Sequence, residues 1–205
     1  MQRAYSVNNV LGAKFNGLDF EGKWLDFIGK PELAKSWIVW GQSGSGKTTF
    51  LMMLAKYLSN FERVLYNSLE EGLSMSIQNA YTRAEITSDN KVLLVNEPMA
   101  VLNERLLRPK SPRIVFIDSI RYTRFRWRDY EEFCKRHPAK ILVWVGHAKG
   151  QEPKGALAED IRYDSFVKIY VEGFRAHATS RYSVDGNTTF DVYEKGALEY
   201  WNKVE

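Results

Sequence analysis

The sequence of 205 residues lacks the features that define several classes of protein. It has one cysteine, Cys134, so a framework of disulfide bonds is excluded and a reducing compartment is favoured. Its longest apolar runs, such as residues 114–117 and 141–145, are far shorter than the roughly 18 residues that span a bilayer. The first residues carry charge without the apolar core of a secretion signal. We therefore expect a soluble, cytoplasmic protein that does not associate with a membrane.

A large excess of charge of one sign is also missing. The chain has 29 lysines and arginines against 25 acids, and its 44% of hydrophobic and 26% of charged residues are typical of a folded domain, which excludes a disordered chain. Basic residues do gather in one place, because residues 121–128 hold four arginines, three aromatic residues and no acid. A local basic and aromatic stretch in a nearly neutral chain indicates a site rather than a general attraction to polyanions.

Apolar runs rich in β-branched and aromatic residues predict the strands, and apolar residues at helical spacing predict the helices. We expect strands at 36–40, 63–67, 92–95, 113–117, 140–145, 166–171, 178–184 and 188–193, with a hairpin turn at Asp185-Gly186-Asn187. We expect helices at 47–59 and 129–136. Fully apolar strands that alternate with helices are typical of parallel sheets buried on both faces. The sequence thus predicts an α/β fold, a three-layer α/β/α sandwich with a mainly parallel central sheet and a C-terminal β-hairpin. We expect one domain, 1–205, with an irregular N-terminal extension (1–35) and a core (36–195).

A glycine-rich segment between the first predicted strand and the first predicted helix matches the pattern G-x-x-x-x-G-K-[ST] in full. Its glycines let the backbone approach an anion closely, and the amides at the start of the following helix face that anion. In this pattern Lys47 reaches the β- and γ-phosphates, and the hydroxyl of Thr48 is a ligand of Mg²⁺. An ordinary glycine–serine turn would share the composition, but the flanking strand and helix favour a site for a nucleoside triphosphate. The predicted binding residues are Gly41, Gln42, Ser43, Gly44, Ser45, Gly46, Lys47, Thr48 and Thr49.

Acidic residues follow two other predicted strands. Asp118 ends the fourth strand, and we expect it to hold the Mg²⁺ ion, through water, together with Thr48. Glu70 comes just after the second strand and is the predicted general base that activates water, with Glu71 as its rival. Acids in these places also suit simpler roles, as the cap of a turn or the partner of a helix dipole.

These motifs together resemble those of the RecA-like ATPases, which include RecA, RadA and the DnaB-type replicative helicases. The segment Ser68-Leu69-Glu70 is similar to the pattern that carries their catalytic glutamate, and Asp118-Ser119 resembles the pair that closes their Walker B strand. The segment 145–149 resembles RadA's Gly-His-Val-Thr-Lys, which implies that His147 senses the γ-phosphate. The resemblance covers roughly residues 36–195 and implies that the nucleotide is ATP.

The resemblance also implies an arginine that acts on the ATP of a neighbouring subunit. Thr179-Ser180-Arg181-Tyr182 is similar to RadA's Lys-Asn-Arg-Phe, which makes Arg181 the candidate, and Arg175 is the other one. Thr179 stands where RadA has lysine, so the two-cation finger of the family is incomplete. A homo-oligomer, either a ring or a filament, is therefore implied. The catalytic residues by this resemblance are Lys47, Glu70, His147, and Arg181 or Arg175.

In RecA-like assemblies the loops after the Walker B strand and after the sensor strand contact single-stranded DNA, which implies this role for residues 119–128 and 147–154. Arginines neutralise phosphates, and aromatic rings stack on bases. Glycines make the second loop flexible enough to rearrange when ATP binds. The aromatic residues could instead pack inward, with the arginines at a subunit interface. The predicted DNA-contacting residues are Arg121, Arg124, Phe125, Arg126, Arg128, Lys149 and Lys154.

From the residues and the resemblance we expect a Mg²⁺-dependent ATPase that acts on single-stranded DNA in the recombination or replication of a phage or mobile element. A core without room for a second large domain resembles single-domain, phage-encoded RecA-like proteins. The alternative is a nucleotide-gated, KaiC-like or loader-type switch whose partner is a protein. A small-molecule kinase fits less well, because the Ser-Leu-Glu segment and the C-terminal hairpin suit it poorly.

Overall fold

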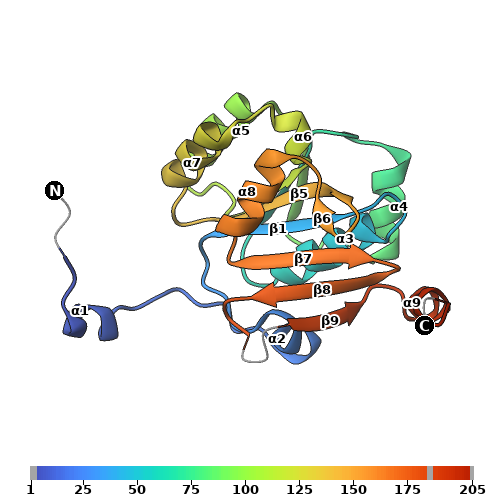
Figure 1. The fold of residues 1–205 in the computed structure, drawn as a ribbon. Helices are drawn as coiled ribbons and strands as arrows, with labels where there is room; N and C mark the ends of the chain where they lie inside the picture. The colour runs from blue at the N-terminus through green and yellow to red at the C-terminus, as the bar shows by residue number, and fades with distance from the viewer. Residues whose placement is uncertain (1–3, 184–186, 204–205) are drawn as a thin grey trace.

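Apolar strands form the centre of the molecule, in a sheet with helices on both faces (Figure 1). The computed structural model describes residues 4–183 and 187–203. Its strands are β1 (Ser36–Gly41), β2 (Val64–Ser68), β3 (Val92–Val95), β4 (Ile114–Asp118), β5 (Ile141–Lys149), β6 (Glu152–Pro153), β7 (Val167–Glu172), β8 (Arg175–Ser180) and β9 (Asn187–Asp191). Its helices are α1 (Val7–Leu11), α2 (Gly22–Ile28), α3 (Lys47–Leu58), α4 (Met75–Arg83), α5 (Met99–Leu107), α6 (Ile120–Thr123), α7 (Trp127–Arg136), α8 (Ala156–Asp164) and α9 (Glu194–Trp201). Within these residues no helix is both long enough and apolar enough to pass through a bilayer.

The strands follow the order β3-β2-β4-β5-β1-β7-β8-β9 across the sheet, and β6 pairs with the end of β5. Those from β3 to β7 run parallel, whereas β8 and β9 are added antiparallel at one edge. The register pairs Ser68 with Asp118 and Gly41 with His147, so the carboxyl ends of β2, β4, β1 and β5 lie along one side of the sheet. The predicted three-layer α/β/α fold with a mainly parallel sheet and a C-terminal hairpin is confirmed.

Both faces of the central strands are buried, because alternate residues point to opposite layers. Trp37 of β1 belongs to an apolar cluster that includes Phe50 of α3. The next residue, Ile38, belongs to a second cluster, with Tyr130 of α7 and Ile161 of α8. Figure 1 shows α5, α7 and α8 on one side of the sheet and α3 on the other. Burial on both faces explains why these strands are continuous apolar runs without an alternation of apolar and polar residues.

The N-terminal extension is not irregular, as the sequence predicted, but contains two helices. Helix α2 belongs to the core, since Phe27 and Ile28 are buried and the hydroxyls of Thr188 and Ser180 donate hydrogen bonds of 2.6 Å to their carbonyl oxygens. Helix α1 buries none of its side chains, and Figure 1 shows it beyond the body of the molecule. The sequence did not predict α2 because the helix begins at Gly22, and a glycine is typical of a turn. The φ of Gly22 is 53°, which is a turn conformation.

Strand β8 covers Arg175–Ser180 rather than the predicted 178–184. The turn before it is tight, because Gly173 and Phe174 both have positive φ, 51° and 59°, and Glu172 pairs directly with Arg175. A phenylalanine in this conformation is rare, so the pattern could not mark the turn. The predicted hairpin turn at 185–187 falls largely on residues 184–186, which lie outside the described residues, although β8 and β9 do pair antiparallel. Helices α4, α5, α6, α8 and α9, which have nine residues or fewer, were too short for a clear periodicity.

His137 lies in a buried position at the end of α7. The residue is 3% exposed, its Nε2 lies 3.1 Å from Oδ1 of Asn103, and its ring packs edge-on against Phe133. Burial, and then the positive charges of Lys140 and Arg136, lower the pKa of His137 from an ordinary 6.5 to about 4. The folded chain therefore resists protonation at this residue more strongly than the unfolded chain does.

We expect acid to destabilise the fold partly through His137. Between pH 6.5 and 4 the unfolded state binds the additional proton, so the free energy of unfolding falls as the pH is lowered through this window. In His137→Gln, whose amide can still reach Asn103, this part of the fall should disappear. Urea unfolding of both proteins at several pH values in the window tests the expectation. Parallel pH profiles for the two proteins would contradict it.

Candidate functional site

The glycine-rich loop joins the end of β1 to the start of α3. A Cβ on Gly41 would lie 2.4 Å from the carbonyl oxygen of Val171, and one on Gly46 would lie 3.1 Å from the ring of Phe174. Gly46 also has a φ of 92°, and it precedes Lys47 at the start of α3 without a side-chain cap. The loop therefore needs glycine for its shape and its close packing. Uncapped amides at the start of a helix form a cradle for an anion.

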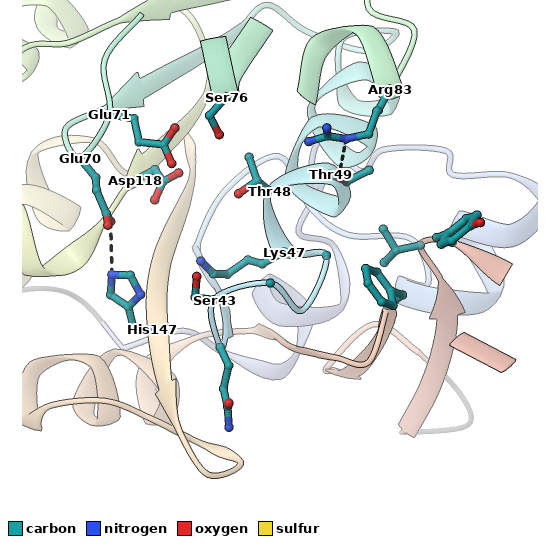
Figure 2. A pocket seen from close by; sticks show the side chains of 16 residues that line it. Ser43, Lys47, Thr48, Thr49, Glu70, Glu71, Ser76, Arg83, Asp118 and His147 are labelled. Atoms are coloured by element: carbon teal, nitrogen blue, oxygen red, sulfur yellow. Dashed lines mark hydrogen bonds and ion pairs between the residues drawn. The ribbon is translucent and has the colours of Figure 1, made fainter. Parts of the chain in front are cut away.

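The loop borders a cavity of about 630 Å³, a volume that suits a small-molecule ligand. Figure 2 shows Lys47 and Thr48 near its centre, between the acids Glu70 and Asp118 and the more distant Arg83. The residues singled out from the sequence that line the cavity are Gln42, Ser43, Gly44, Gly46, Lys47, Thr48, Thr49, Glu70, Glu71, Asp118 and His147. The lining residues that sequence reasoning missed are Ser76, Arg83, Phe174, Val192 and Tyr193.

Phe174 and Tyr193 give the cavity an aromatic wall. Their rings pack edge to face with centroids 6.0 Å apart, and the ring of Phe174 lies beside Gly46. The amide of Phe174 donates a 3.0 Å hydrogen bond to the carbonyl oxygen of Ser45, which fixes the wall to the glycine-rich loop. An aromatic surface beside an anion cradle suits the flat face of a nucleobase. No sequence signal links the two, because the contact arises from the tight turn between β7 and β8.

Asp118 ends β4 at the cavity, where the hydroxyl of Tyr66 donates a hydrogen bond of 2.5 Å to its Oδ2. Burial raises the pKa of the Asp118 carboxyl, and the hydrogen bond from Tyr66 and the charge of Lys47 oppose that rise. This carboxylate and the hydroxyl of Thr48 are oxygen donors of the kind that Mg²⁺ prefers. In the described ranges no three histidine, cysteine, aspartate or glutamate side chains are grouped to hold a metal ion. Phosphate oxygens of a nucleotide and water would supply the further ligands of a Mg²⁺ ion held here.

Glu70 contacts the predicted sensor, a pairing that the sequence did not predict. Its Oε2 lies 3.2 Å from Nε2 of His147 (Figure 2) and accepts a hydrogen bond of 3.0 Å from the hydroxyl of Ser119. Its rival Glu71 also lines the cavity, but its carboxylate accepts a hydrogen bond of 3.1 Å from Ser74 in the same loop. Glu70 is thus fixed to two strand ends of the sheet, whereas Glu71 is fixed within its own loop.

The two arginines assigned to a neighbouring subunit do not line the cavity of their own chain. Arg175, at the start of β8, forms a bidentate ion pair with Asp191, with an Nε–Oδ1 distance of 2.5 Å and an Nη2–Oδ2 distance of 3.4 Å. Arg181 follows the other end of β8, where it is exposed and its guanidinium lies 4.2 Å from the centre of the Phe166 ring. A role in trans needs a second copy of the chain, so both assignments stay predictions.

The basic stretch after β4 is divided between a second cavity and the core. Arg121 and Arg124 line this second cavity, which has a volume of about 740 Å³ and shares Glu70 and His147, among others, with the first. Phe125 borders it too, but its ring packs against inward-facing aromatic residues of α7 and β5, with centroid distances of 5.8 and 6.3 Å. Phe125 therefore both packs against the core and borders the second cavity, and its contact with DNA stays a prediction.

Three of the predicted DNA-contacting residues do not line the second cavity, namely Arg126, Arg128 and Lys149. Arg126 precedes α7, and its amide donates a 2.8 Å hydrogen bond to Asp129. Arg128 pairs with Glu132 one helical turn further on, at 3.0 Å. These residues form part of the surface of α7 and the end of β5 rather than a wall of either cavity.

The segment after His147 is a short hairpin, not the flexible loop that the sequence predicted. Strand β5 continues to Lys149 and pairs antiparallel with β6. The side chains of Trp40 and Tyr170 donate hydrogen bonds of 2.8 and 3.1 Å to carbonyl oxygens at its tip. Lys154, just after the hairpin, lines the second cavity. Gly150 therefore lies in the turn of a hairpin that is fixed to β1 and β7, whereas Gly146 lies within β5 and Gly155 precedes α8.

Solved structures share this fold, although the sequence matches no protein-family model and no curated protein. The flagellar accessory protein FlaH from Methanocaldococcus jannaschii is similar with a TM-score of 0.60 and 18% identity, over 88% of this chain and 96% of FlaH. A second solved structure, which is described as an ATPase domain, is similar with a TM-score of 0.55 and 13% identity, over 80% of this chain and 84% of that domain. At these identities the likeness shows the fold alone. The chain therefore has the same fold as these two structures, a three-layer α/β/α sandwich with a mainly parallel sheet.

We expect Tyr66→Phe to destabilise the protein by about 1–3 kcal/mol, because it removes the donor to a buried carboxylate. Tyr81→Phe is the matched control, since the Tyr81 hydroxyl is also buried but has no hydrogen-bond partner within the described part of the chain. Its removal should cost little. Urea unfolding at neutral pH measures both, and equal losses in the two variants would contradict a role for the Tyr66–Asp118 hydrogen bond.

Proposed function

We propose that this protein is a Mg²⁺-dependent ATPase that acts on single-stranded DNA as a homo-oligomer, in the recombination or replication of a phage or mobile element. The observation that carries the ATPase proposal is that Lys47, Thr48, Glu70 and Asp118, from three separate parts of the chain, line one cavity. Each is of the residue type that its proposed role requires. One of the solved structures with this fold is itself an ATPase domain.

In this proposal the triphosphate of ATP lies on the amides of the glycine-rich loop. Lys47 binds the β- and γ-phosphates, and the base packs on the aromatic wall of Phe174 and Tyr193. Thr48 and Asp118 hold Mg²⁺, which supplies positive charge to the phosphate oxygens as negative charge develops on them. The glycine-rich loop, whose shape and packing need glycine at Gly41 and Gly46, and the oxygen donors beside it support this fit.

Glu70 is the proposed general base. It takes a proton from water while the water oxygen bonds to the γ-phosphorus and the bond to the β–γ bridging oxygen breaks, which yields ADP and phosphate. Lys47 offsets the charge on the phosphate oxygens, and His147 senses the γ-phosphate. Arg181, or else Arg175, of a neighbouring copy completes the site.

Single-stranded DNA is the proposed partner because of the chemistry of the second cavity. Arg121, Arg124 and Lys154 line it, together with Tyr122, whose residue is 47% exposed. Cationic side chains beside an accessible aromatic ring suit a backbone of phosphates with bases free to stack. The second cavity also borders the first, which supports a link between DNA binding and ATP turnover.

We expect Glu70→Gln to keep ATP binding while turnover falls by about 10²–10⁴-fold, because an amide cannot accept the proton from water. ATP binding by calorimetry and phosphate release measure the two effects. Glu71→Gln is the control, since its side chain lines the same cavity. The assignment fails if turnover survives in Glu70→Gln and is lost in Glu71→Gln.

We expect the double variant Arg121→Ala/Arg124→Ala to bind single-stranded DNA more weakly. The slope of log affinity against log salt should also become shallower by about 1.4, at roughly 0.7 for each phosphate contact. Fluorescence anisotropy with a labelled oligonucleotide at several salt concentrations measures this, and Lys135→Ala, on α7 outside the cavity, is the control. Equal effects in the two proteins would show that the cavity is not the DNA site.

The alternative, a nucleotide-gated switch with a protein partner, has one observation of its own in its favour. The structure with the TM-score of 0.60 is described as a flagellar accessory protein. On this alternative Arg124, Arg126 and Arg128 belong to a protein interface. Their replacement would weaken oligomers, which sedimentation measures, and DNA binding would be absent before any replacement.

A further inference from the structure

We infer that Ser119 and His147 are positioning residues that hold one oxygen of Glu70 and leave the other free for catalysis. The inference rests on the proposed function, in which Glu70 is the general base. Both contacts end on the same atom, because Oε2 of Glu70 lies 3.0 Å from the hydroxyl of Ser119 and 3.2 Å from Nε2 of His147. Oε1 has no hydrogen-bond partner in the described ranges and is the oxygen left to accept a proton from water.

Ser119 ties Glu70 to the end of β4. The residue is 1% exposed, so its hydroxyl is held at one place in the molecule. The amides of Leu69 and Glu70 donate hydrogen bonds of 2.6 and 3.2 Å to the carbonyl oxygen of Asp118, the residue before Ser119. Backbone and side chain therefore fix the base to the same strand end as the proposed metal ligand. A base held in this way keeps its distance to the reacting phosphate constant.

His147 ties the same oxygen to the second cavity. Its carbonyl oxygen accepts a 2.8 Å hydrogen bond from the amide of Lys154, a residue that lines that cavity. Glu70 and His147 themselves border both cavities, and Figure 2 shows them facing one another at one side of the first. We expect a polyanion that binds Lys154 to act through this hydrogen bond on the backbone of His147 and on the orientation of Glu70.

The two donors consequently have different tasks. Ser119 supports Glu70 whatever occupies the second cavity, because it is buried at a strand end. His147 supports Glu70 to an extent that depends on the hairpin after β5 and on Lys154. Ser119 should thus set the basal rate, and His147 should transmit the effect of DNA on that rate.

The test uses the full-length protein and measures kcat and KM for ATP, with and without a saturating single-stranded oligonucleotide. In Ser119→Ala we expect kcat to fall by about 10–100-fold under both conditions, with KM within about threefold, because the base is present but misplaced. Ser119→Thr, which keeps the hydroxyl, should recover most of the loss. In His147→Ala the stimulation by DNA should disappear, and His147→Gln, whose amide can still donate to Oε2, should restore it in part.

A double variant separates positioning from a structural role. If Ser119 acts through Glu70, adding Ser119→Ala to Glu70→Gln should lower kcat no further, whereas independent damage to the fold would multiply the two losses. A wild-type kcat in Ser119→Ala, equal losses in the Ala and Thr variants, or full DNA stimulation in His147→Ala would overturn the inference. So would a wild-type protein whose turnover DNA does not change. Undiminished turnover in Glu70→Gln would instead overturn the proposed base itself, so the two failures are distinguishable.

Discussion

Burial of the parallel strands on both faces is the constraint on which the rest of the structure depends. Trp37, Ile38, Val115 and Phe116 are fully buried. An ionised group in these apolar surroundings would lose its hydration, and apolar neighbours could not offset that loss of free energy. In β1, β2, β4 and β5 the charged side chains therefore lie only at the carboxyl ends of the strands. Because β1, β2, β4 and β5 run in one direction, their carboxyl ends meet at one side of the sheet. The candidate site follows from the way in which the core is built.

The charges at this side of the sheet are tolerated because each acid has a donor. Burial raises the pKa of Asp118, and the charge of Glu70 adds to that rise, while Tyr66 and Lys47 oppose it. Glu70 in turn takes its donors from Ser119 and from the sensor strand. The same hydrogen bonds that make these carboxylates compatible with the fold also orient them toward the cavity. A Mg²⁺-nucleotide brings both the cation and the anion for which such an arrangement is suited.

The parts of the site that could be predicted from the sequence are those marked by short patterns of neighbouring residues. The glycine-rich loop and the acids after β2 and β4 are short patterns, and the rule that parallel strands end together brings them to one place. Phe174 escaped prediction because it reaches the loop through a tight turn whose φ of 59° no motif marks. Phe125 has a part that its sequence context does not mark, because its ring packs on aromatic residues of α7 and β5 while it also borders the second cavity. The segment after His147 was predicted to be a flexible loop because of its glycines. The hydrogen bonds that hold it as a hairpin come from Trp40 and Tyr170, which are distant in sequence and leave no local pattern.

ATP hydrolysis by the purified protein at several protein concentrations, with and without single-stranded DNA at fixed low salt, tests the central claim most directly. If an arginine from a neighbouring copy completes the site and DNA acts through the second cavity, turnover per subunit rises with protein concentration and rises again with DNA. A turnover per subunit that depends on neither, or the absence of hydrolysis under every condition, would contradict the account.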